Sequence, residues 1–155
     1  MTATTENKID DVMERASQAL ATQAYFESER LSRKAMSMAQ SANDYERMAR
    51  IALPLQEARR HRLQQALDVG EVTILDDTQV ITEEMDIAKG CYLVVPMLVG
   101  ADGRRVRLAA LSRDVPVAVV TREPTTRLGM IPIVAVGGGM TVRTQVEPPD
   151  DEDHI

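Results

Sequence analysis

The fold of the N-terminal half is decided by residues 24–67, AYFESERLSRKAMSMAQSANDYERMARIALPLQEARRHRLQQAL. Small and apolar residues recur in its first part at alternating steps of four and three, which is the spacing of one helix face. This stripe consists of Ala24, Ser28, Leu31, Ala35, Met38 and Ala42. Its small side chains predict a helix that packs closely on a neighbour. The opposite face carries Glu27, Glu29 and Arg30, which are expected to lie in solvent.

Asn43 and Asp44 mark the turn to a further helix. Their side chains bond free backbone amides and tolerate non-helical dihedral angles, so they are predicted to end one helix and cap the next. The next helix begins at Tyr45, and Pro54 removes a backbone donor within it. We therefore expect a kink near Leu53, with helix continuing to residue 67. Its apolar side is predicted to contain Met48, Ala49, Ala52 and Leu55.

One more helix is predicted ahead of this stretch, at residues 8–22. Apolar side chains recur there at helical spacing, namely Ile9, Val12, Met13, Ala16 and Leu20. Residues 1–5 are small and polar and are expected to fray. Gly70 suits a left-handed exit from the last helix. The chain therefore begins with a three-helix unit, residues 6–68.

From residue 71 the helical spacing gives way to β-rich runs bounded by Gly, Pro and Asp. Strands are predicted at residues 72–75, 91–95, 117–121, 131–136 and 141–146. The runs CYLVV and VAVV are apolar at every position, which indicates strands covered on two faces and a parallel or mixed sheet. Residues 102–113 are predicted as a crossover helix capped by Asp102, because RLAALSR favours helix. A hairpin at Asp102-Gly103 is the alternative.

The three glycines 137–139 lie between the last two strands and predict a hairpin turn. The chain then ends in EPPDDEDHI, an acidic and proline-containing segment that predicts a disordered tail, residues 149–155. The expected fold class is thus α+β or α/β. A helical unit, residues 6–68, is expected to pack on a small mixed-sheet α/β unit, residues 69–148.

The composition argues against several functional classes. The net charge is -6 and aromatic residues make up only 3% of the chain, so nucleic-acid binding is not favoured. Cys91 is the single cysteine, which excludes an internal disulfide and favours the cytoplasm. No apolar run reaches the ~20 residues of a membrane span, so no membrane partner is expected. His61 and His154 lack any metal-ligand spacing, and neither a metal nor a cofactor is predicted.

Tyr25, Ser28, Ala35 and Met36 match positions of a known helical repeat. An aromatic, a small residue three positions later, and then Ala followed by a large apolar residue are typical of the second helix of a tetratricopeptide repeat (TPR), which residues 24–36 resemble. Ser32 departs from the aromatic usual there, and no 34-residue period follows. The whole layout also resembles bacterial proteins in which helical repeats precede an α/β segment.

The resemblance implies a noncatalytic role in protein binding, scaffolding or self-assembly through the helical face. A single repeat cannot bury both of its faces, so it is expected to stack on the α/β half or on another copy. Arg59, Arg60 and Arg62 form the densest basic patch, and with Tyr25 they are the predicted partner-binding residues. A solvated helix face is the plainer interpretation of the same arginines. Docking of the acidic residues 150–153 on them is a further hypothesis.

The alternative function is binding of a small molecule or nucleotide by the α/β unit. Open α/β sheets bind ligands at the carboxyl ends of their strands, next to helix N-termini. The polar residues predicted at that edge are Gly100, Asp102, Arg104, Thr121, Arg122 and Thr125. They include no histidine, nucleophilic thiol or carboxylate pair, and Cys91 lies in an apolar run typical of the core. No catalytic residue is therefore predicted.

Overall fold

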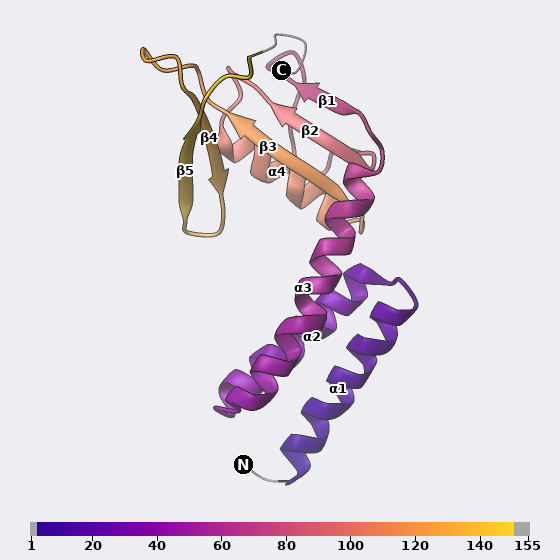
Figure 1. Ribbon diagram of the computed structural model, residues 1–155. Coiled ribbons are helices and arrows are strands. Elements are labelled where there is room, and N and C mark those ends of the chain that lie inside the picture. Colours follow the sequence, from indigo (N-terminus) through magenta and orange to yellow (C-terminus); the bar gives the residue numbers. More distant parts are fainter. Residues whose placement is uncertain (1–2, 151–155) are drawn as a thin grey trace. The chain divides into compact units, whose positions relative to one another are not determined.

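A computed structural model of the chain describes residues 3–150. Within these residues, three helices precede a five-stranded mixed sheet that carries one further helix (Figure 1). This is an α+β arrangement, and the predicted fold class is confirmed. The chain divides into two compact units, Met1–Gln64 and Gln65–Ile155. The boundary lies in the last turn of the third helix.

Helices α1 (Ala3–Ala21) and α2 (Tyr25–Ser41) form a closely packed pair. Their shared core also includes Ile51 from the third helix, and its other buried members are Ile9, Val12, Ala16, Ala19, Leu31, Ala35 and Ala39. The prediction that residues 3–5 fray is wrong, because α1 already begins at Ala3. Glu6 in its first turn interacts favourably with the positive end of the helix dipole.

Small side chains allow α2 to approach α1, as the stripe predicted. Ser28 and Ala35 are fully buried, and the Ser28 hydroxyl donates a hydrogen bond of 3.0 Å to the carbonyl oxygen of Ala16. Ala24 lies exposed at the start of the stripe, whereas Ser32 and Ala39 are buried and complete it. The Ser28 side chain is thus small enough for close packing of the two helices. Unlike a methyl group, it also forms a hydrogen bond with the backbone of α1.

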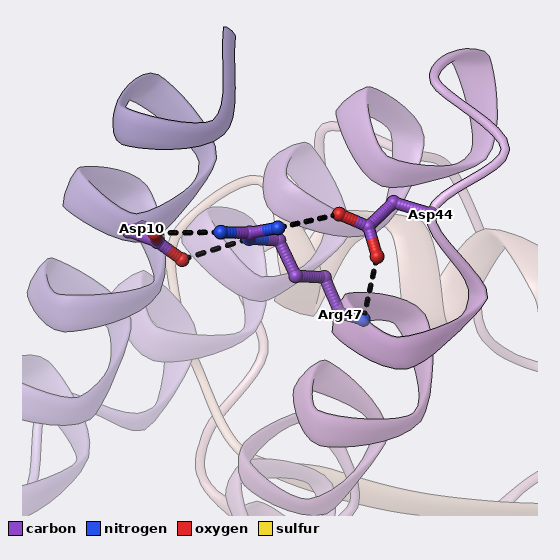
Figure 2. A network of polar contacts seen from close by, with 3 residues as sticks. All are labelled: Asp10, Asp44 and Arg47. Atoms are coloured by element: carbon purple, nitrogen blue, oxygen red, sulfur yellow. Dashed lines mark hydrogen bonds and ion pairs between the residues drawn. The ribbon is translucent and has the colours of Figure 1, made fainter. Parts of the chain in front are cut away.

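The turn between α2 and α3 (Tyr45–Leu67) places Asp44 at the centre of a polar network (Figure 2). Asn43 is left-handed, with φ 54°, and Asp44 accepts a hydrogen bond of 3.0 Å from the Arg47 backbone amide. The Arg47 guanidinium donates to Asp44 at 2.7 Å and to both carboxylate oxygens of Asp10 at 2.9 and 2.8 Å. The predicted cap at Asp44 is confirmed, and the network joins α3 to α1.

The same network shifts the titration of both carboxyl groups. Hydrogen bonds from the Arg47 guanidinium lower the pKa of Asp10 below its usual 3.8. The Arg47 backbone amide, and then its guanidinium, lower the pKa of Asp44 in the same direction. Because these pKa values are lower in the folded state, the ionised carboxylates stabilise the fold above the unfolded-state pKa, and this stabilisation is lost as pH falls through the folded-state values.

Arg47→Met is therefore expected to flatten the acid limb of the stability profile. The wild-type melting temperature should fall steeply as pH drops from about 5 to about 3, because the two carboxylates take up protons on unfolding. The variant should be less stable at neutral pH and should lose less over the same interval. Thermal unfolding followed by circular dichroism at each pH measures both slopes. Equal acid slopes for the two proteins would contradict this assignment.

Helix α3 continues across Pro54 and buries a different side from the one predicted. Ile51 and Ala58 are almost inaccessible. Of the predicted apolar side, Met48 packs against the core, whereas Ala49 and Ala52 are exposed. The reason lies in the helical geometry. Residues 51 and 58 are seven apart and share one helix face, whereas residues 49 and 52 lie about 160° and about 100° from residue 51 around the axis. Gly70 follows the helix with φ +75°, and the predicted left-handed exit is confirmed.

The second unit contains one sheet with the strand order β1-β2-β3-β4-β5. Its strands are β1 (Val72–Leu75), β2 (Gly90–Val94), β3 (Val117–Arg122), β4 (Ile131–Val136) and β5 (Thr141–Val146). The first three run parallel, and β4 and β5 are antiparallel to their neighbours. The five predicted strands and the mixed sheet are confirmed.

Helix α4 (Gly100–Leu111) connects β2 to β3 and covers one face of the sheet (Figure 1). Its Val106 is fully buried in a cluster with Tyr92, Val94 and Leu75. The predicted crossover helix is confirmed over the hairpin. It starts two residues before Asp102, whose carboxylate accepts a hydrogen bond of 2.8 Å from the Val99 amide and so caps the helix from inside its first turn.

The chain after β4 follows the predicted hairpin. Gly139 has φ +79°, and the Gly137 amide donates a hydrogen bond of 2.8 Å to the Met140 carbonyl oxygen across the turn. Residues 147–150 form neither helix nor strand. The rest of the predicted acidic tail, residues 151–155, lies outside the described part of the chain, and so does most of the segment predicted to dock on the arginines.

Candidate functional site

The predicted basic patch surrounds a buried carboxylate. Glu29 of α2 is only 9% exposed, and it accepts a hydrogen bond of 3.1 Å from Arg59 Nε and another from the Arg62 guanidinium, both of α3. The expectation that Glu29 lies in solvent is wrong. Its partners are 30 and 33 positions away in the chain, so the pattern within α2 carried no sign of them.

Two aromatic rings of α2 extend this contact. The Arg62 guanidinium lies 3.9 Å from the centre of the Phe26 ring, a cation–π arrangement. Tyr25 stacks on His61, with ring centres 4.7 Å apart and planes 7° from parallel. Tyr25 and Arg62, both predicted to bind a partner, therefore lie in the packing between α2 and α3.

Arg59 and Arg60 keep more of their surface in solvent, with side chains 56% and 59% exposed. Each nevertheless has a carboxylate partner, since Arg60 donates to Glu57 at 2.9 Å. This pairing lowers the pKa of Glu57, mainly through that hydrogen bond. The structure thus brings the four predicted residues together on two helices. Arg59 and Arg62 hold α3 against α2 through Glu29, whereas Arg60 pairs within α3.

Glu29→Gln should destabilise the helical unit, because it removes the charge that two arginines share. We expect a loss of about 1–2 kcal/mol in the free energy of unfolding, in the range of charge-assisted hydrogen bonds with partly exposed partners. Glu27→Gln is the matched control, since Glu27 lies on the same helix and pairs with exposed Arg30 at 3.1 Å. It should change stability by less than about 0.5 kcal/mol. Urea unfolding measures both, and equal losses would contradict a central role for Glu29.

The predicted ligand edge is filled by close packing between α4 and the sheet. A Cβ atom on Gly103 would lie 2.0 Å from Thr121 Oγ1, and one on Gly100 would lie 2.7 Å from Val136 Cγ2. Thr121 is 4% exposed. These glycines therefore have a packing role: only a residue without a side chain lets α4 lie this close to β3 and β4.

The other predicted ligand residues do not converge on one point. Arg122 follows Thr121 in β3, so its side chain leaves the opposite face of the sheet. Asp102 is taken up by the helix cap and by Arg105, which donates to it at 2.6 Å. Arg104 is half-buried on α4, and Thr125 is exposed in the segment between β3 and β4. Among residues 3–150, moreover, no group of three or more His, Cys, Asp or Glu side chains could hold a metal ion.

Two exposed apolar surfaces escaped the sequence analysis. The first is the α3 outer stripe, defined as Tyr45, Ala49, Ala52, Leu53 and Leu63. These residues lie on the side of α3 opposite its buried face. Tyr45 and Leu53 are 73% and 68% exposed. The exposed half of this helix is therefore apolar at several positions where a solvated helix carries charges.

The second surface is the side of the sheet opposite α4. Alternate residues of each strand point to that side, and the register aligns them across neighbouring strands. We call it the open sheet face and define it by Val72, Ile74, Leu93, Val120, Ile133 and Val142. The signal was present in the sequence, because strands that are apolar at every position need two covers.

Comparisons of this chain with models of protein families, with curated proteins and with solved structures find no match. Within the described part of the chain, none of the helices combines the length and apolar character that crossing a membrane requires.

Proposed function

We propose that this chain is a noncatalytic interaction protein that binds a protein partner, or copies of itself, through its helical unit. The observation that carries the proposal is the α3 outer stripe. Burying a large apolar side chain contributes roughly 1.5–3 kcal/mol to the free energy of association, so covering Tyr45 and Leu53 would favour the packing of a second helix there. Arg59 and Arg62, which bond Glu29, belong to the same helix, α3, and add charged groups beside the apolar ones.

The arrangement of α1, α2 and α3 supports a repeat-like role. A closely packed helix pair followed by a third helix is the composition of one TPR and the first helix of another, in keeping with the resemblance at Tyr25, Ser28, Ala35 and Met36. Stacked repeats end in a helix with a polar outer face. The outer face of α3 is instead partly apolar, like that of a helix inside a stack of repeats. The proposed partner supplies the next layer of the stack.

A noncatalytic role agrees with the chemistry of the polar residues. The carboxylates of Asp10 and Glu29 bond arginines of α3 and so hold helices together, and Asp44 caps α3. The cytoplasm is the proposed location, because a chain whose only cysteine is Cys91 gains nothing from an oxidising compartment. A protein partner is proposed, rather than a membrane or a nucleic acid.

A photo-crosslinking residue at position 53 tests this proposal in the cells that make the protein. Position 53 should join the chain to one or a few defined proteins, because Leu53 would lie inside the contact. The matched control is position 34, where Lys34 is exposed on α2. Products that appear at 53, disappear with an excess of unmodified chain and are missing at 34 are expected. The same products at both positions, or none at 53, would contradict the proposal.

A further inference from the structure

The open sheet face is apolar across all five strands. Val72 and Ile74 of β1 are 64% and 50% exposed, Val120 of β3 is 45% exposed, and Val142 of β5 is 56% exposed. The strand register places one charged side chain among the residues of this face, that of Arg122 at the end of β3. Leaving these apolar side chains in water is unfavourable, and burying them would lower the free energy.

The unit itself covers little of this face. Its helix α4 lies behind the strands in Figure 1, against the other side. On the open side, the last turn of α3 contacts the start of β2, where the Cys91 thiol lies 3.6 Å from the Ala66 carbonyl oxygen. Parallel strands with apolar residues on both sides are found almost only where both sides are covered. The open sheet face is therefore a surface on which a second layer could pack.

Of the surfaces that could pack on the open sheet face, that of a second copy of the chain fits its chemistry best. The outward sides of α1 and α2 carry charges such as Asp11, Glu14 and Arg33, and the sheet has one charge with which to pair them. Burying such groups unpaired is costly. The α3 outer stripe is one helix wide and matches only part of five strands. A second copy offers a surface of the same size that is equally apolar.

The area suits such a dimer. Five strands spaced by about 4.8 Å and up to six residues long, at about 3.3 Å each, span roughly 450 Å² in flat projection. Two copies bring together about 900 Å² before the relief of the side chains is counted. Specific interfaces begin at about 1,000 Å² in total accessible area, slightly above this flat value, so a dimer of this kind needs the whole face together with the added area of its side chains.

We infer that two copies of this chain associate through their open sheet faces and form a sandwich of two sheets about a two-fold axis. Aligned sheets pack about 10 Å apart, with side chains of the two inner faces interdigitating. Arg122 is the last residue of β3, so this one charged residue lies at an end of the face, and polar groups are common at the margins of interfaces. This contact is separate from the α3 outer stripe and leaves that surface free for the proposed partner.

Val120→Lys tests the inference, because Val120 is in the central strand and a two-fold contact buries the new charge twice. Sedimentation velocity of the full chain from about 1 to 100 μM should show a dimer for the wild type. The variant should weaken the dimer at least about 100-fold, since unpaired buried charges cost several kcal/mol. Val80→Lys is the matched control: Val80 is 82% exposed in the segment between β1 and β2, and its replacement should leave the dimer unchanged.

Two more variants make the outcomes decisive. Circular dichroism checks folding, and Val142→Lys on the edge strand replaces Val120→Lys if the latter does not fold. Leu53→Lys should leave the dimer intact. A monomeric wild type, or dimers that resist both sheet variants, overturns the inference. A dimer lost in Leu53→Lys and kept in Val120→Lys also overturns it, and would support self-association through the helical unit instead.

Discussion

The second unit has a sheet that is apolar on both sides, whereas its helix α4 covers one side. The strands β2 and β3 are apolar on both sides, yet the segment between them folds into a single helix, α4, which can cover one side only. Gly100 and Gly103 let that helix lie against β3 and β4, so one side is closely packed. The other side leaves Val72, Ile74, Val120 and Val142 exposed. Burial of apolar surface dominates folding and association alike, and the uncovered side therefore points to association.

The helical unit solves its own packing with small residues and shared charges. Ser28, Ala35 and Ala39 let α2 approach α1, and two polar clusters then fix α3 near both ends. One joins Arg47 to Asp10 and Asp44, and the other joins Glu29 to Arg59 and Arg62. Charges that suggest a binding surface in the sequence thus have a structural use. The outer side of α3 stays exposed and partly apolar, with Tyr45 and Leu53 in solvent.

Local rules predicted the elements whose causes are local. Asp44 caps its helix because its carboxylate reaches an amide three residues later, and Gly139 turns the hairpin because glycine accepts a positive φ. Glu29 was misjudged because its arginine partners are 30 or more residues away. The ligand edge around Thr121 and Arg122 stays a prediction whose residues leave opposite faces of β3. The open sheet face required strand register, which pairs residues across the whole unit.

Side-chain footprinting at high and low chain concentration tests the central claim, that a second copy covers the open sheet face. Carbene labelling reports the accessibility of individual aliphatic side chains. At high concentration, Ile74, Val120 and Val142 should be protected while Val80 and Leu128 are labelled, and the protection should disappear on dilution. Labelling of all five at every concentration would contradict the claim, as would protection that persists at every dilution, which would mean that the same chain covers its own sheet.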